Sequence, residues 1–157
     1  MTERSVVHCN FTIERIYDAA PARVFAAFAS KEAKQTWCAC DDEWETIEFE
    51  LDFRVGGREI NRNGPKGGTV HVFNGIYQDI VPNERIIIGF DMHLDARKIS
   101  VSLITIEFKP AGKGTRLLFT EQGVFLDGYD DIAGREHGTG IGLDNLEKYL
   151  QREMTKA

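Results

Sequence analysis

Two arginines on either side of a double glycine are the first candidates for ligand chemistry in this sequence. Arg54 and Arg58 are close enough in the chain to act together, and two guanidinium groups at the mouth of a pocket could hold a carboxylate or an enolate through paired hydrogen bonds. The same arginines could instead form salt bridges with the acidic side of the preceding segment, formed by Glu48, Glu50 and Asp52. Both interpretations stay open.

Two carboxylates and three histidines are candidates for proton transfer. Glu107 and Glu121 would suit that role if they were buried near a substrate. His71, His93 and His137 fall on two expected strands and at the start of an expected helix, and an imidazole near neutral pH can serve as a general base or as a ligand. We take Glu121 and His137 as the first of these to test and leave the catalytic residues unassigned.

The cysteines and the short motifs indicate neither a metal nor a cofactor. Cys38 and Cys40 form one close pair, whereas a tetrahedral zinc site needs four ligands, or three and a water. The chain contains no phosphate-binding loop, nucleophile elbow or dinucleotide fingerprint. If the protein is an enzyme, we therefore expect acid/base chemistry rather than nucleophilic or redox chemistry.

Length, charge and apolar runs narrow the classes of function. The 157 residues suit one domain, residues 1–157, and a domain of this size buries about 70% of the surface of its unfolded chain. Acidic residues outnumber basic ones by 25 to 19 without a basic cluster, which disfavours direct nucleic-acid binding. The longest apolar run, residues 24–29, is too short to span a bilayer. Because the start lacks the apolar segment of an export signal, we expect no membrane insertion and a cytoplasmic protein with reduced thiols.

The spacing of apolar residues predicts an antiparallel sheet interrupted early by two short helices. Residues 6–18 have the composition of a strand. Pro21 suits the first turn of one helix, and Ser30 suits the cap of a second. Further strands, separated by turn residues, are predicted at residues 46–53, 58–62, 69–81, 85–94, 99–108 and 116–124.

One long helix is expected to close the chain, from just after Gly128 to about Met154. Its apolar stripe should pack across the concave face of the sheet, an arrangement that tends to leave a cavity. Gly134, Gly138 and Gly142 recur every four residues in its first half, although each glycine costs about 1 kcal/mol of helix stability relative to alanine. They allow either tight packing against the sheet or a partner helix, or room for a ligand.

Several motifs taken together resemble one family. They are the segment from Asp18 to Trp37, the run from Asp52 to Arg58, the stretch from Gly75 to Arg85, the stretch from Thr120 to Gly128, and the residues from Arg135 to Gly138. This set resembles the C-terminal domain of the activator of the heat-shock protein 90 ATPase, within the START-like (SRPBCC) superfamily, over about residues 11–152. The resemblance implies an α+β helix-grip fold, similar to the birch-pollen allergen. In that fold a curved antiparallel sheet wraps around a long C-terminal helix, and two short helices follow the first strand.

The resemblance does not name an activity, because the superfamily includes lipid carriers, hormone receptors, polyketide cyclases and co-chaperones. Our first hypothesis is the binding of a small hydrophobic or amphipathic molecule between the sheet and the last helix. The alternatives are an acid/base enzyme of the polyketide-cyclase type and a co-chaperone that activates a chaperone ATPase. The co-chaperone is less favoured, because the resembling activator uses a second domain that this chain has no room for. A homodimer also stays open. The candidate ligand-binding residues are Trp37, Arg54, Arg58, Met92, Glu121, Tyr129, His137 and Gly138.

Overall fold

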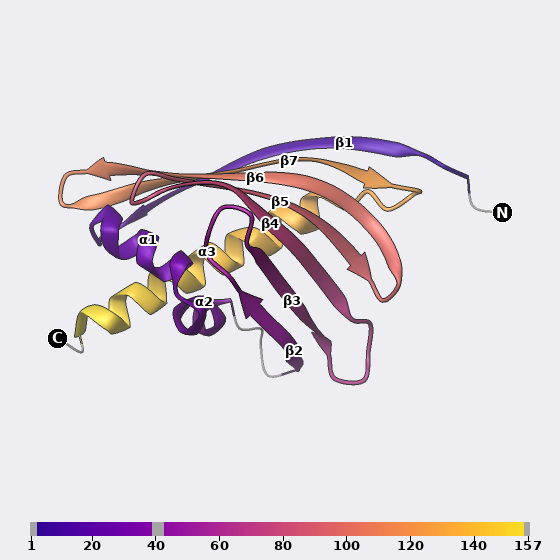
Figure 1. The fold of residues 1–157 in the computed structure, drawn as a ribbon, viewed down its shortest axis with the longest axis horizontal. Coiled ribbons are helices and arrows are strands. Elements are labelled where there is room, and N and C mark those ends of the chain that lie inside the picture. The colour runs from indigo at the N-terminus through magenta and orange to yellow at the C-terminus, as the bar shows by residue number, and fades with distance from the viewer. Residues whose placement is uncertain (1–2, 39–42, 156–157) are drawn as a thin grey trace.

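The structure, a computed structural model, describes residues 3–38 and 43–155. Along these described residues, one strand is followed by two helices, six further strands and a final helix (Figure 1). These elements are β1 (Val6–Tyr17), α1 (Pro21–Ala29), α2 (Lys31–Trp37), β2 (Trp44–Leu51), β3 (Arg58–Pro65), β4 (His71–Val81), β5 (Arg85–Leu94), β6 (Arg97–Ala111), β7 (Gly114–Leu126) and α3 (Ile132–Thr155).

The strands form a single curved sheet in the order β1-β7-β6-β5-β4-β3-β2, with every neighbouring pair antiparallel. Helix α3 crosses the hollow side of this sheet, and α1 and α2 lie on that same side (Figure 1). Leu143, Leu146 and Leu150 of α3 are buried in the hydrophobic core. The hydroxyl of Tyr17 donates a hydrogen bond of 2.8 Å to the carbonyl of Leu143, which ties β1 to α3. The expected helix-grip fold is confirmed.

Local interactions explain the two short helices. Pro21 occupies the first turn of α1, where its missing N–H removes no helical hydrogen bond. The hydroxyl of Ser30 accepts a hydrogen bond of 3.2 Å from the backbone N–H of Ala33, so it caps α2. At the end of α2 the indole of Trp37 donates a hydrogen bond of 2.9 Å to the carbonyl of Ala27. This bond anchors α2 to α1 and fixes the Trp37 ring in the interior.

Strand β2 departs from the simple alternation that its sequence predicts. Phe49 is buried, but Ile47, expected on the same side, is 50% exposed. The register with β3 shifts between Thr46 and Glu48, so Ile47 is an extra residue on this edge strand. A bulge of this kind breaks the two-residue period, and the period alone could not locate it.

Candidate functional site

A cavity of about 530 Å³ lies between the hollow side of the sheet and α3. Its wall on the sheet is mostly apolar and includes Phe73 and Phe90, whose rings stack with centroids 4.4 Å apart. Trp37 reaches it from α2 and Trp44 from the start of β2. The remaining apolar side chains of the sheet wall are Ile88, Met92, Ile104, Ile106 and Phe119.

The glycines of α3 form the opposite wall. Gly134, Gly138 and Gly142 all border the cavity. A methyl group added at Gly138 or Gly142 would meet no atom of the described residues within 4 Å, so these two positions face open space and not a packed neighbour. Gly134 differs, because its added carbon would lie 2.2 Å from a carboxylate oxygen of Asp131, which accepts a hydrogen bond from the Gly134 N–H.

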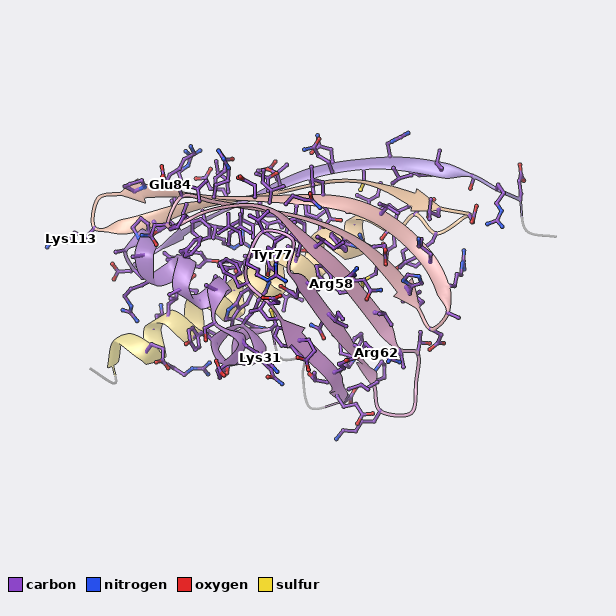
Figure 2. All side chains as sticks on the ribbon, in the orientation of Figure 1. Lys31, Arg58, Arg62, Tyr77, Glu84 and Lys113 are labelled. Carbon is purple, nitrogen blue, oxygen red and sulfur yellow. The ribbon has the colours of Figure 1, made fainter. Side chains whose placement is uncertain are left out.

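A buried group of three polar side chains stands at the β3 end of the cavity. Glu59 of β3 is 4% exposed, and its Oε1 accepts hydrogen bonds from Lys34 Nζ and from the Tyr77 hydroxyl, both at 2.5 Å. Figure 2 shows Tyr77 on the helix side of the sheet. Burial is the largest single influence on the pKa of Lys34 and lowers it, but the charge of Glu59, the smaller effects of Tyr77 and Cys38, and the hydrogen bond to Glu59 together outweigh burial and raise the pKa. Lys34 therefore stays charged, and burial raises the pKa of Tyr77, which stays a hydrogen-bond donor.

A second buried ion pair joins α3 to β7. Arg135 Nη1 donates to Glu121 Oε2 at 2.9 Å, and Nη2 donates to the Ser100 hydroxyl at 2.7 Å. The guanidinium carbon lies 4.7 Å from the ring centre of Phe125 and 5.7 Å from that of Phe90, distances typical of cation–π contacts. Glu121 is 1% exposed. The pair is held in place on several sides and shielded from water.

The remaining polar groups of the lining differ in exposure. His71 packs beside Trp44 with ring centres 4.8 Å apart, and burial lowers its pKa although the charge of Asp95 opposes that shift. Its imidazole is therefore neutral at pH 7. Asp131 is exposed, as are Gly134 and Gly138, so the cavity reaches solvent beside the first half of α3.

The sequence also matches a known protein family, and this match agrees with the observed sheet order and with the helix that crosses the sheet. The family model described as Activator of Hsp90 ATPase homolog 1-like protein matches residues 18–151. The chain belongs to this family. Membership supports a ligand-binding fold in general and names no ligand. No curated protein matches the chain.

Several solved structures share the architecture of this chain. A protein from Rhizobium leguminosarum is 48% identical, with a TM-score of 0.91 over 96% of this chain and 99% of that one. The Mll3558 protein from Rhizobium loti is 45% identical, with a TM-score of 0.86 over 92% and 99% of the two chains. An AHSA1-like protein from Aeromonas hydrophila is 20% identical, with a TM-score of 0.70 over 92% and 94%, and shares the fold alone.

Five of the eight residues predicted for ligand binding border the cavity: Trp37, Met92, Glu121, Tyr129 and Gly138. They come from α2, β5, β7, the connection before α3, and α3 itself. These five residues therefore lie around one space, although they are spread widely along the chain. Whether they bind a ligand stays a prediction.

The other three residues lie outside the described lining of this cavity. Arg54 forms an exposed ion pair with Asp52 at 2.9 Å, the salt-bridge interpretation that its sequence left open. Arg58 is exposed on β3 (Figure 2), and His137 is exposed on α3. Arg58 immediately precedes Glu59, so the alternation of the strand turns it away from the cavity. We leave these three residues out of the site.

The other candidates for proton transfer are also separated from one another. Glu107 lies 3.7 Å from Lys109 on the outer side of β6, and His93 lies beside Asp91 on β5 at 3.3 Å. Of the three histidines only His71 borders the cavity. These three histidines therefore do not converge on one site.

Residues that sequence reasoning missed include Glu59, Lys34, Tyr77 and Ser100. One feature of the sequence could have indicated a polar interior at this place. It is the segment REINRNGP of β3, in which Ile60 is the single aliphatic residue apart from the closing proline. Polar side chains occur on both faces of such a strand, so some of them must point into the interior whichever face is buried. Ile60 points away from the cavity, so Glu59 and its polar neighbours point into it.

The predictions about the cysteine pair and about membrane insertion can be compared with the described residues. Cys40 lies outside the described residues, so the cysteine pair cannot be placed. Across residues 3–38 and 43–155, no group of three or more histidine, cysteine or carboxylate side chains is arranged to hold a metal ion. In the same part of the chain, every helix is too short or too polar to cross a membrane.

Proposed function

We propose that this protein binds a small, mostly apolar molecule in the cavity between its sheet and α3. One observation supports this most directly: Gly138 and Gly142 border the cavity where an added methyl group would meet nothing. Interior glycines weaken a helix by about 1 kcal/mol each. Their presence beside open space is explained if a ligand occupies the volume that side chains would otherwise fill.

The size and the wall of the cavity support the same proposal. Its volume of about 530 Å³ falls within the range of roughly 300–1,000 Å³ that is common for small-molecule sites. Phe73, Phe90 and Trp37 offer flat apolar surface, and burying such surface stabilises a complex by about 25 cal/mol for each Å² removed from water. Aromatic or alicyclic skeletons fit these walls best.

The tryptophans provide a direct assay. The chain has two, Trp37 and Trp44, and both border the cavity. A neutral apolar fluorophore such as N-phenyl-1-naphthylamine absorbs near the emission of tryptophan. Excitation of the protein should therefore produce energy transfer to the probe that saturates as the cavity fills, and fluorescence titration measures it.

The decisive variant is Gly138→Leu, with His137→Leu as its matched control. The new leucine at residue 138 projects into the cavity and should reduce probe affinity at least tenfold. The same leucine at the exposed residue 137 should leave affinity unchanged. Circular dichroism and thermal unfolding confirm that both variants fold. Equal affinity in native protein and Gly138→Leu, or no saturable binding by the native protein, would overturn the proposal.

A further inference from the structure

We infer that the cavity selects electrically neutral ligands that carry a hydrogen-bond donor at one end and an acceptor at the other. This inference rests on the proposed function and narrows the class of molecule that the same site would take. It follows from the way in which the charged groups of the described lining are arranged.

The buried charges of the lining already cancel one another. Lys34 is paired with Glu59, and their side chains are 14% and 6% exposed. Arg135 is paired with Glu121, with exposures of 13% and 1%. The two positive and two negative side chains therefore leave no net charge in the buried part of the described lining.

Two further groups of the lining, His71 and Asp131, do not change the balance. His71 is neutral, because burial lowers its pKa. The fifth charged side chain is Asp131, which lies exposed at the start of α3 and accepts a hydrogen bond from the Gly134 N–H. Its charge is in contact with water and not with the depth of the cavity.

A ligand with a net charge would therefore enter an apolar space without a free partner of opposite sign. Removing an ion from water without a compensating charge is costly. A ligand carboxylate beside Arg135 would be repelled by the carboxylate of Glu121, which is held at 2.9 Å from Nη1. A ligand ammonium beside Glu59 would likewise be repelled by Lys34. A neutral molecule avoids both costs.

The ion pairs nevertheless offer hydrogen bonds to a neutral ligand. Among the described residues, both hydrogen bonds that Glu59 accepts end on Oε1, so Oε2 can accept one from a ligand hydroxyl or amide N–H. Arg135 donates to Glu121 and Ser100 through one N–H on each terminal nitrogen, and a guanidinium has further N–H groups. These can donate to a ligand carbonyl or ether oxygen.

The two polar ends are separated by the apolar wall. Glu59 is on β3, and Arg135 packs against β6 and β7 through Ser100 and Glu121. Strands β4 and β5, which carry the stacked Phe73 and Phe90, lie between them in the sheet. The matching ligand is an elongated or flat apolar skeleton with its polar atoms at opposite ends.

Three nearly isosteric probes test this inference on the native protein. They are 2-naphthamide, which is neutral, 2-naphthoate, which is an anion at pH 7.5, and 2-naphthylmethylammonium, which is a cation. Isothermal titration calorimetry should give an affinity for the amide at least tenfold higher than for either ion. An ion that binds as tightly as the amide overturns the inference. Binding of N-phenyl-1-naphthylamine with no preference among the three probes also overturns it, while the proposed function stands.

A charge-removing variant tests the cause of the preference. Glu121→Gln leaves Arg135 without its anionic partner, so 2-naphthoate should now bind more tightly than 2-naphthamide. Glu107→Gln makes the same change on the outer side of β6 and should keep the native preference. If Glu121→Gln folds and still prefers the amide as strongly as the native protein does, the inference is wrong. The native comparison decides the question if that variant fails to fold.

Discussion

The carboxylate of Glu59 illustrates how single residues set the character of this interior. It is charged and buried, and two donors on different elements converge on one of its oxygens. A buried ion is tolerated only when such partners replace the water that it has lost. The contribution of the Lys34–Glu59 pair to stability is therefore seen when one partner is removed and the charge of the other is left buried alone.

Removing the positive partner should destabilise the protein strongly. Lys34→Met keeps most of the length of the side chain but leaves the Glu59 charge without compensation, so we expect the free energy of unfolding to fall by about 3–5 kcal/mol. Lys31→Met is the matched control on the same helix, because Lys31 is 43% exposed and pairs with Glu50 at 3.5 Å. Exposed pairs contribute about 0–1 kcal/mol. Urea unfolding followed by circular dichroism measures both.

A second substitution separates lost charge compensation from lost packing. The double variant Lys34→Met with Glu59→Gln removes the buried charge as well, so it should regain part of the stability that Lys34→Met loses. Equal losses in Lys34→Met and Lys31→Met, or a double variant less stable than Lys34→Met alone, would contradict this account of the pair.

At the scale of elements, α3 combines two halves with different tasks. The second half carries Leu143, Leu146 and Leu150, which are buried in the core. The first half carries the glycines and Arg135, and it borders the cavity. The second half of α3 thus packs in the hydrophobic core, and the first half leaves space for the cavity.

This division predicts opposite effects for one substitution at two glycines. Gly142 is in α3 beside open space, so Gly142→Ala should raise the free energy of unfolding by about 1 kcal/mol through helix propensity. Gly128 has a φ of +88°, where a side chain is strained, so Gly128→Ala should lower it by about 1–2 kcal/mol. An added methyl meets nothing within 4 Å of the described residues at either position, so the backbone alone decides the sign. Two effects of the same sign in urea unfolding would refute this.

Most of the helices and strands could be predicted from the sequence, because each is determined by residues that are close together in the chain. The predicted strand at residues 85–94 agrees with β5, Arg85–Leu94, because apolar residues alternate along it. Ile47 could not be placed because a bulge depends on pairing with another strand. In the site, Glu121 was a candidate from the start, as one of two carboxylates on predicted strands that could serve in proton transfer. Glu59 was not found, because its partners Lys34 and Tyr77 meet it only in three dimensions.

At the scale of the whole molecule, the cavity is shared by parts that are distant in the chain. Lys34 of α2, Glu59 of β3 and Arg135 of α3 all border it. Phe28 of α1 also borders it, so a bound ligand would lie among helices α1, α2 and α3 and strands β2 to β7. Because such a site is lost when the chain unfolds, ligand binding and folding should be thermodynamically linked.

The linkage can be measured as a thermal shift. At a ligand concentration of about 100 times Kd, binding should raise the free energy of unfolding by about 2.7 kcal/mol. For a chain of this length that corresponds to an increase in Tm of about 5–11 °C. Differential scanning calorimetry with N-phenyl-1-naphthylamine should show this increase as a shift of one cooperative transition, and Gly138→Leu should show almost none. An equal shift in Gly138→Leu would mean that the probe binds elsewhere. A transition that splits in two would mean that the cavity forms independently of the rest of the sheet.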